Sequence, residues 1–568
     1  MVAQLSPSEV QNAVDSREPV ALIDVRQSLD YVNGNVASST RVPRPDLERR
    51  IAELVPNRST PVILIDDHGE RAALDANWLE SLGYDRVDYL SGGIEAWTDA
   101  GLDLVEAVDD VHATAFGYES KAFGEQVEAS RDLPKLSPDE LAERRDDVTV
   151  VDVRNPPEYD RYGTIPGSIN VEGVDLALYA DELRDDEPLV VHCAGRTRSI
   201  IGTATLQALG IDDVYELENG TMGWELAGHE LDTGPGRPTE LDVDDDRYRR
   251  LLSSVEELLA DTDASFLDPC ELTELHAIDD ESGRTTYLFD VRTESEFEAD
   301  HVPGARWVAG GQLIQTAGRH IAVREADIVL VSETHVRSSI TAYWLSEMGY
   351  PNVHVLRGGT SAWVDAGHDL VTGSDDSVPL GGARVAEAVA YVSPDELATL
   401  AADDRTEVLD VGSRDSYVEG HVPGAAWVPR YELESAITTE LGDVERVILT
   451  CESGEVSSRA AAQLDHVEDA PNDAAVDVTG DAAVDAAVDV TGDGAVDAAV
   501  DVTGDAEIDD VELLVLDGGT ASWHRSGNDV ETGEARILIE PRDAIRKPYA
   551  QGTREMRRYL EWEETLVE

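Results

Sequence analysis

Apolar and polar positions follow two patterns along this chain. Short apolar runs end in an acidic residue and lead into polar turns, as in ALIDVR at 21–26 and VVDVR at 150–154. Longer stretches place apolar residues three or four positions apart, as at 70–84, 199–211 and 337–350. The first pattern predicts buried strands and the second predicts amphipathic helices. Their alternation predicts an α/β fold in which a parallel sheet carries helices on both faces.

The strand that ends in Asp recurs at a domain-sized period, with further copies in LFDVR at 288–292 and VLDVG at 408–412. A second signature is a strand followed by Gly-Gly or Asn-Gly and then a tryptophan. The glycines allow a tight turn, and we expect each tryptophan to close a hydrophobic core. The chain is therefore predicted to hold four tandem copies of one α/β domain. The four tryptophans of the second signature are Trp97, Trp224, Trp363 and Trp523.

Composition indicates a soluble and strongly acidic protein. The 568 residues are too many for one core, and 118 acidic against 44 basic residues give a net charge of -74. Lysine occurs only as Lys121, Lys135 and Lys547, a bias typical of adaptation to high salt, and 41% hydrophobic residues argue against a disordered chain. Neither a signal peptide nor an apolar run of about eighteen residues is present. We expect a cytoplasmic protein with no nucleic-acid and no membrane partner.

One segment, LVVHCAGRTRSIIGTATLQAL at 189–209, delivers a cysteine into a short loop that opens a helix. Cys193 should meet the positive end of the helix dipole and two guanidinium groups, so we predict a lowered pKa and a nucleophilic thiolate. A buried, inert thiol is the alternative, but glycine and two arginines within five residues are a poor way to build a core. The candidate catalytic residue is Cys193, and the candidate substrate-binding residues are Ala194, Gly195, Arg196, Thr197, Arg198 and Ser199.

The corresponding loops of the other three copies are DDHGER, SETHVR and CESGEV. Asp66 and Ser332 stand where the thiol belongs in the first and third copies, so these copies are predicted to be inactive. The fourth copy keeps Cys451 but has Val456 at the closing arginine position, so we interpret its loop as degenerate. Cys270 belongs to no such loop and is interpreted as structural. Three scattered cysteines fit neither a disulfide framework nor a metal site, and we predict no metal.

Together, Asp-Val-Arg after a strand, the Pro-Gly turns in TIPGSIN and HVPGA, the cysteine loop and Gly-Gly-x-x-x-Trp resemble the rhodanese (sulfurtransferase) domain. The resemblance spans nearly the whole chain as four tandem modules, and KAFGEQVE at 121–128 and the tail at 547–568 resemble the four-module members. The expected domains are 1–110 (inactive), 125–236 (catalytic), 263–373 (inactive), 385–535 (degenerate loop, with a low-complexity acidic insertion at 472–506) and 536–568 (a tail helix packed on a domain).

The resemblance implies a sulfurtransferase that uses no cofactor. Cys193 would attack the outer sulfur of thiosulfate or a similar small donor, release sulfite, and pass the persulfide sulfur to a thiol or cyanide. The two loop arginines would bind the oxyanion of the donor. Asp152 and Arg154 are interpreted as a pair that orders the loop, and Glu158 stands where some family members place a donor-binding arginine. His192 should face away from the thiol, since side chains alternate along a strand.

Three other functions are weighed against this one. Related phosphatases and arsenate reductases use a loop one residue longer, so the Cys-x4-Arg spacing here disfavours them. A sulfur-relay protein would take persulfide sulfur from a cysteine desulfurase for tRNA or cofactor thiolation, with the inactive modules as docking surfaces. A non-catalytic scaffold would bind anions without turnover. The last two remain alternatives.

Overall fold

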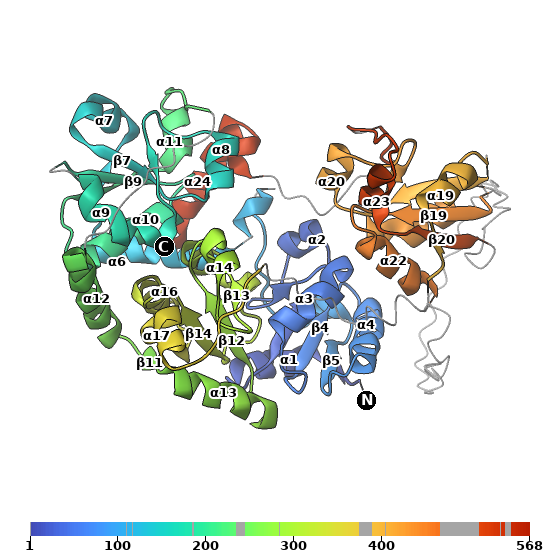
Figure 1. The fold of residues 1–568 in the computed structure, drawn as a ribbon, viewed down its shortest axis with the longest axis horizontal. Coiled ribbons are helices and arrows are strands. Elements are labelled where there is room, and N and C mark those ends of the chain that lie inside the picture. The colour runs from blue at the N-terminus through green and yellow to red at the C-terminus, as the bar shows by residue number, and fades with distance from the viewer. Residues whose placement is uncertain are drawn as a thin grey trace, which may run out of the picture. The chain divides into compact units, whose positions relative to one another are not determined.

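The chain forms two compact units in the computed structural model. The first comprises Met1–Leu380 and Arg542–Glu568, and the second comprises Gly381–Pro541. Residues 547–567 therefore return to the first unit after the chain has built the second (Figure 1). The structure describes residues 2–108, 111–115, 117–184, 187–233, 245–282, 284–373, 389–403, 405–442, 444–465, 511–533, 535–539 and 547–567. The acidic insertion expected at 472–506 lies outside these residues.

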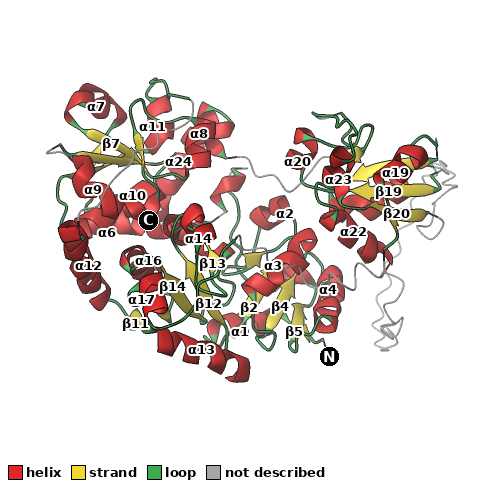
Figure 2. Cartoon of the chain, viewed as in Figure 1, coloured by secondary structure: helices red, strands yellow, loops and turns green. Residues whose placement is uncertain are grey.

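Four sheets of five parallel strands confirm the predicted fold class, and Figure 2 shows helices flanking the strands. Every sheet repeats one strand order, so we number the domains modules 1 to 4. Module 1 has the order β1-β5-β4-β2-β3 and module 2 the order β6-β10-β9-β7-β8. Their strands are β1 (Gln4–Leu5), β2 (Ala21–Asp24), β3 (Thr40–Arg41), β4 (Val62–Ile65), β5 (Val87–Leu90), β6 (Lys135–Leu136), β7 (Thr149–Asp152), β8 (Ile169–Asn170), β9 (Leu189–His192) and β10 (Val214–Leu217).

Modules 3 and 4 repeat the arrangement with the orders β11-β15-β14-β12-β13 and β16-β20-β19-β17-β18. The strand that ends in the repeated Asp always lies between the strand that leads into the loop and one edge strand. Their strands are β11 (Ser265–Leu267), β12 (Thr286–Asp290), β13 (Arg306–Trp307), β14 (Asp327–Val331), β15 (Val353–Leu356), β16 (Tyr391–Val392), β17 (Thr406–Asp410), β18 (Ala426–Trp427), β19 (Arg446–Thr450) and β20 (Glu512–Leu516).

Helices link the strands of each sheet and also link the modules. None in the described part of the chain is both long and apolar enough to cross a membrane. The helices of modules 1 and 2 are α1 (Pro7–Asp15), α2 (Ser28–Asn33), α3 (Leu47–Leu54), α4 (Glu70–Ser81), α5 (Gly93–Asp99), α7 (Pro138–Glu143), α8 (Pro156–Tyr162), α9 (Leu176–Arg184), α10 (Thr197–Ala208) and α11 (Gly220–Leu226). Those of modules 3 and 4 are α13 (Pro269–Ser282), α14 (Glu294–Ala299), α15 (Gly310–Gln315), α16 (Val336–Glu347), α17 (Gly359–Asp365), α19 (Pro394–Leu400), α20 (Arg414–Glu419), α21 (Leu433–Ser435), α22 (Glu455–Asp465) and α23 (Gly519–Arg525). Outside the modules lie α6 (Tyr118–Arg131), α12 (Asp245–Ala260) and α24 (Thr553–Glu564).

The helices predicted at 70–84, 199–211 and 337–350 are α4, α10 and α16. Each is followed within two residues by a glycine in the left-handed region, with φ of 95° at Gly83, 85° at Gly210 and 85° at Gly349. A left-handed residue ends a helix, and glycine adopts that conformation without a steric penalty. The sequence therefore carries both the helix pattern and its stop signal.

The four signature tryptophans are core residues, as predicted. Each lies in a separate hydrophobic cluster of its own module. Each indole Nε1 also donates a hydrogen bond to the backbone carbonyl six residues further on, for example from Trp97 to Asp103 at 3.1 Å and from Trp224 to Glu230 at 3.0 Å. Each tryptophan thus fills the core of its module, and a backbone carbonyl accepts the hydrogen bond of its one polar atom, Nε1.

Modules 1, 2 and 3 share one large hydrophobic cluster. Trp344 of α16 is fully buried in it, and its indole Nε1 donates to Thr205 Oγ1 of α10 at 2.8 Å. Between modules 1 and 3, the Thr60 and Thr285 hydroxyls lie 2.6 Å apart. Three modules therefore pack as one body.

We expect Trp344→Ala to lower the free energy of unfolding by about 3–5 kcal/mol, because it empties a large buried volume between two modules. Urea unfolding followed by tryptophan fluorescence and by circular dichroism measures the loss. Trp344→Phe is the matched control, since it keeps an aromatic ring in place and gives up the hydrogen bond, worth about 1 kcal/mol, together with a smaller part of the buried volume. Equal losses in both variants would contradict the packing role.

The tail packs on module 2 and on the linker before it. Helix α24 contacts α6 and α11, and Figure 1 shows it beside module 2. Six tail residues form one hydrophobic cluster with Met222 of α11 and with the segment around Ala113. They are Leu566 and the five side chains that the sequence predicted to pack, namely Tyr549, Met556, Tyr559, Leu560 and Trp562.

Candidate active site

Cys193 follows β9 directly and begins the loop that leads into α10. Two carbonyl groups of the loop accept hydrogen bonds from α11. Cys193 O accepts from Thr221 N at 2.9 Å, and Ala194 O accepts from Met222 N at 3.0 Å. Gly220 makes this approach possible, because it has a φ of 53° and a Cβ there would lie 2.3 Å from Cys193 O. While the first turn of α11 engages the loop carbonyls, the N–H groups of Gly195 and Ser199 face the sulfur.

The Cys193 thiol is buried, with 2% of the residue exposed, and its sulfur lies 3.6 Å from Ser199 Oγ. Burial raises the pKa of the thiol above its ordinary value, while the Arg198 guanidinium, Ser199 and the Gly195 N–H act in the opposite direction. The predicted lowering of the pKa is therefore wrong. The cost of desolvating the thiolate exceeds the stabilisation that the loop gives it. The sequence suggested that two arginines act on the sulfur, and Arg198 is the one that does so.

Arg196 lies in a buried network with the linker helix α6. Its Nε donates to Glu125 Oε1 at 2.6 Å and its Nη2 to Glu125 Oε2 at 2.7 Å, while a second carboxylate, Glu128, also accepts from Nη2. Nη1 donates to Asn219 Oδ1 at 3.2 Å. The guanidinium is bonded to two carboxylates and fixes the loop against α6, while the predicted role of Arg196 in binding the donor oxyanion stays a prediction.

Arg198 closes the loop and is paired with Glu158 of α8. Its Nη1 and Nη2 donate to the two carboxylate oxygens of Glu158, both at 2.8 Å, and Tyr549 of the tail donates to the same carboxylate at 3.1 Å. Although burial works against ionisation, the charge and hydrogen bonds of Arg198 hold the pKa of Glu158 at about 2. Glu158, which stands where some family members place a donor-binding arginine, thus partly neutralises the charge of Arg198.

Asp152 and Arg154 form the buried pair that the sequence suggested. Arg154 Nε donates to Asp152 Oδ1 at 2.9 Å, Arg154 Nη2 donates to Gly163 O at 2.6 Å, and Thr164 Oγ1 donates to Asp152 Oδ2 at 2.7 Å. The pair therefore fastens the end of β7 to the turn after α8. His192 is fully buried, and burial lowers its pKa to about 4, so the ring is neutral near pH 7.

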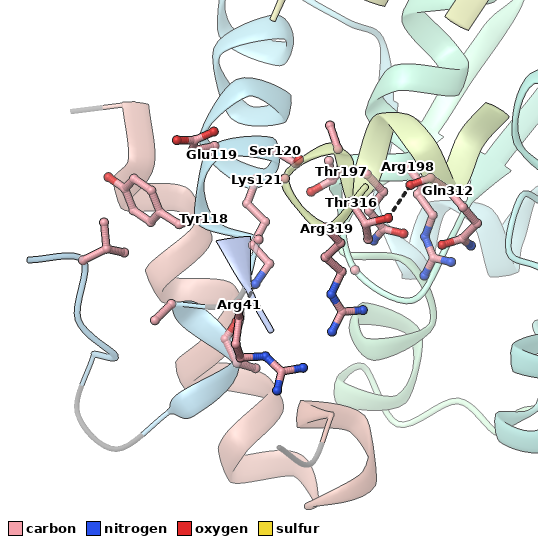
Figure 3. Close-up of a pocket in the computed structure, with 18 of the residues that line it drawn as sticks. Arg41, Tyr118, Glu119, Ser120, Lys121, Thr197, Arg198, Gln312, Thr316 and Arg319 are labelled. Carbon is pink, nitrogen blue, oxygen red and sulfur yellow. Dashed lines mark hydrogen bonds between the residues drawn. The ribbon is translucent and has the colours of Figure 1, made fainter. Parts of the chain in front are cut away.

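The loop opens onto a cavity of about 680 Å3 that modules 1, 2 and 3 and the tail line together. Figure 3 shows part of this lining, with Arg41, Lys121 and Arg319 pointing into one space near Thr197 and Arg198. Seven basic side chains and three carboxylates line the cavity. This balance reverses that of the whole chain, which has 118 acidic and 44 basic residues. The cavity is therefore a basic site in an acidic protein.

The tail forms part of the wall beside the loop. A Cβ on Gly195 would lie 2.8 Å from Met222 Cε and 3.4 Å from Glu563 Oε2, so tail and loop approach closely. Burial raises the pKa of Glu563 to about 7 against the charge of Lys121, and burial lowers the pKa of Lys121 to about 8. Sequence reasoning missed both residues, although the scarcity of lysine was a signal: Lys121 and Lys547 both line this cavity.

Comparison with known proteins agrees with the geometry. The rhodanese-like domain family matches residues 6–100, 137–227, 271–366 and 393–479. The chain belongs to the rhodanese family. A crystal structure of thiosulfate sulfurtransferase from Pseudomonas aeruginosa is 32% identical, with a match that covers 100% of this chain and 97% of that chain at a TM-score of 0.83. Thiosulfate sulfurtransferase of Azotobacter vinelandii is 26% identical over 280 residues, 42% of this chain and 96% of that protein.

The loop of rhodanese module 1 holds a carboxylate in place of the thiol. Asp66 accepts hydrogen bonds from Gly69 N and from Ala72 N, the latter at 3.0 Å. Its carboxylate thus occupies the anion position of the loop permanently. In rhodanese module 3 the Ser332 and Ser338 hydroxyls lie 3.0 Å apart. Both loops keep the fold of the site without a sulfur.

The loop of rhodanese module 4 keeps a buried thiol, and Gly454 N donates to Cys451 Sγ at 3.2 Å. No arginine closes it, and the nearby Arg459 Nε lies 3.6 Å from Glu455 Oε1. Module 4 belongs to the second unit, so it has its own surroundings. Cys270, interpreted from the sequence as structural, is exposed at the start of α13 and is corrected to a surface residue.

Proposed function

We propose that this rhodanese-type sulfurtransferase moves the sulfane sulfur of thiosulfate to a thiol or to cyanide through a persulfide on Cys193. One observation carries the proposal: among the four loops, that of module 2 combines a thiol with a closing arginine, and it faces the basic cavity. The relatives named thiosulfate sulfurtransferase support the choice of donor.

The first half-reaction exchanges one sulfur–sulfur bond for another. The Cys193 thiolate attacks the outer sulfur of thiosulfate, the bond inside thiosulfate breaks, and sulfite leaves with the electron pair. The cysteine then carries a terminal sulfur with a negative charge. The loop N–H groups and Arg198 favour the thiolate, and they would also stabilise the charge of the terminal sulfur, which lies one sulfur–sulfur bond from the Cys193 sulfur.

The second half-reaction regenerates the thiolate. Cyanide or an acceptor thiolate attacks the terminal sulfur, the persulfide bond breaks, and the Cys193 sulfur keeps the electron pair. The products are thiocyanate or a small persulfide. Both half-reactions are nucleophilic displacements at sulfur, so no electrons are lost or gained overall and neither step calls for a cofactor.

The cavity suits an anionic donor. Thiosulfate carries two negative charges, and the basic lining raises its local concentration within a protein whose net charge is -74. Lys547 lies within electrostatic reach of Arg198 and Glu158, which places a further cation near the loop. We assign the sulfonate end of the donor to Lys547 and Arg198.

Mass spectrometry of the full chain after thiosulfate treatment tests the persulfide. We expect a gain of one sulfur atom on the peptide that contains Cys193, and its removal by cyanide. The peptides of Cys451 and Cys270 serve as internal controls and should gain none. Sulfur on Cys451 alone, or on no cysteine, would reject the proposal. Sulfur on Cys193 only after incubation with a cysteine desulfurase would favour the relay function.

A further inference from the structure

The cavity next to Cys193 contains a second group of cations, built by modules that have no catalytic thiol. Arg41 comes from β3 of module 1, Arg319 from the short helical turn Ala317–Arg319 of module 3, and Lys121 from the linker helix α6. Their side chains point into one space in Figure 3. Modules 1 and 3 thus contribute charge to a cavity on which the loop of module 2 opens.

Contacts between modules 1 and 3 hold this group in place. Thr40 Oγ1 donates to Gly318 O at 3.0 Å, and Arg50 Nη2 donates to Arg319 O at 2.7 Å. Arg41 Nη1 donates to Ser28 Oγ at 2.7 Å within module 1. The backbones that carry Arg41 and Arg319 are therefore fixed to each other, and the group exists only while the modules are packed together.

The electrostatics of the group favour an anion. Burial and the charges of Arg41 and Arg50 lower the pKa of Arg319 to about 10. Lys121 is subject to burial and to the charges of Lys547 and Arg319, which oppose the effect of Glu563. A shielded cavity lined by several cations attracts an anion.

The size of the cavity indicates what that anion is. About 680 Å3 exceeds what thiosulfate needs, and it falls within the roughly 300–1,000 Å3 typical of sites for organic ligands. Cys193 lines the same cavity, so an organic molecule held by the cations can present a thiol to the persulfide. The ligand must therefore be an anion that the cations can hold and must present a thiol. A small thiol that carries carboxylates meets both requirements, because guanidinium groups bind carboxylates in a paired geometry.

We propose that Arg41, Arg319 and Lys121 form a subsite for the carboxylates of a small acidic thiol, which is the sulfur acceptor. The proposal rests on the transfer function proposed above and names the class of its acceptor. The acceptor thiolate attacks the terminal sulfur of the Cys193 persulfide, its sulfur–sulfur bond forms, and the Cys193 sulfur leaves as the thiolate. Modules 1 and 3 thereby select the acceptor although their own loops carry no thiol.

The test compares two acceptors of opposite charge character on the full chain that thiosulfate has first converted to the persulfide. Mercaptosuccinate carries two carboxylates, whereas 2-mercaptoethanol carries none, and both are studied at one ionic strength. In Arg41→Gln and Arg319→Gln we expect the half-saturating concentration of mercaptosuccinate to rise at least about tenfold, since each variant removes a charged hydrogen-bond donor. Transfer to 2-mercaptoethanol should stay within about twofold of the unchanged chain.

Arg49→Gln is the matched control, because it removes the same charge from module 1 at an exposed position where Arg49 pairs with Asp46 at 3.0 Å. It should leave both acceptors unaffected. Equal effects of Arg41→Gln and Arg319→Gln on the two thiols would overturn the subsite. So would a loss of persulfide formation from thiosulfate in these variants, because the cations would then serve the donor.

A binding measurement separates failure of the subsite from failure of the transfer function. Succinate has the two carboxylates and no thiol, so its binding to the full chain by calorimetry is independent of any persulfide. We expect binding that Arg41→Gln and Arg319→Gln weaken at least about tenfold. If Cys193 never gains sulfur but succinate binds in this way, the transfer function fails and the anion subsite stands. If the persulfide forms and succinate does not bind, the subsite is rejected and the transfer function stands.

Discussion

Cys193→Ser should abolish thiocyanate production from thiosulfate and cyanide, with a loss of at least about 1000-fold, because a hydroxyl cannot carry the transferred sulfur. The substitution is nearly isosteric, and Ser332 shows that the loop of module 3 accommodates a serine at the corresponding position. The loss would therefore report chemistry rather than folding. A steady-state thiocyanate assay in molar KCl measures it.

Cys451→Ser is the control within the same chain. Cys451 is as buried as Cys193, with 2% exposed, and it follows the corresponding strand of module 4. Its loop carries no closing arginine, so we expect most of the activity to remain. Equal losses in the two variants would show that module 4 takes part in turnover. Full activity in Cys193→Ser would remove the basis of the assignment.

The fold could be predicted from the sequence because its signals are local and repeated. The period of apolar residues located α4, α10 and α16, and the glycines that end them lie next to them in sequence. Trp97 and Trp224 could be assigned to cores since each forms its hydrogen bond only six residues away. Four repeats of the same signals then fixed the number of modules.

The electrostatics of the loop could not be predicted in the same way. The sequence places Arg196 two residues from Arg198, which suggested that both face the donor. The partners of Arg196 are Glu125 and Glu128, 71 and 68 residues away in the linker helix α6. No local pattern indicates such a pairing. The pKa of Cys193 depends on how deeply the thiol is buried, which is likewise a property of the folded chain.

The basic cavity could be predicted from the sequence only in part. Its residues come from modules 1, 2 and 3 and the tail, so spacing along the chain says nothing about their meeting. Composition did carry a signal, because lysine is nearly absent from the chain, yet Lys121 and Lys547 both line the cavity. A rare residue type that is retained at a few positions is a candidate for function even when its neighbours in space are unknown.

Modules 1 and 3 keep the fold of the loop without a cysteine. In module 1, Asp66 supplies the negative charge that the loop N–H groups would otherwise offer to a thiolate. In module 3, Arg337 corresponds to Arg198, and it pairs with Glu296 Oε2 at 2.6 Å and Asp175 Oδ1 at 2.8 Å. Asp175 belongs to module 2, so the former loop arginine now joins two modules. The loop of module 3 thus takes part in the packing against module 2.

Arg198→Met and Glu158→Gln should shift the pH dependence of persulfide formation in opposite directions. Arg198 lowers the pKa of the Cys193 thiol against the effect of burial, and Glu158 partly neutralises Arg198. The thiolate is the attacking species, so the rate below the pKa rises with pH and falls about tenfold for each unit by which the pKa rises. Removing a guanidinium at this range raises a pKa by about 1–3 units, so Arg198→Met should slow the reaction at pH 7 by about 10- to 1000-fold.

Glu158→Gln keeps the shape of the side chain and removes the carboxylate charge, so Arg198 acts on the thiol with its full charge. The inflection of the pH profile should move to lower pH, and the rate at pH 7 should rise, because pH 7 lies below the pKa of the thiol. Rapid mixing of the full chain with saturating thiosulfate between pH 6 and 10, with the persulfide trapped and counted, gives both profiles. Saturating donor removes differences in its affinity from the comparison. A shift of both variants in the same direction would mean that the pair positions the loop and that the charge of Arg198 does not set the ionisation of the sulfur.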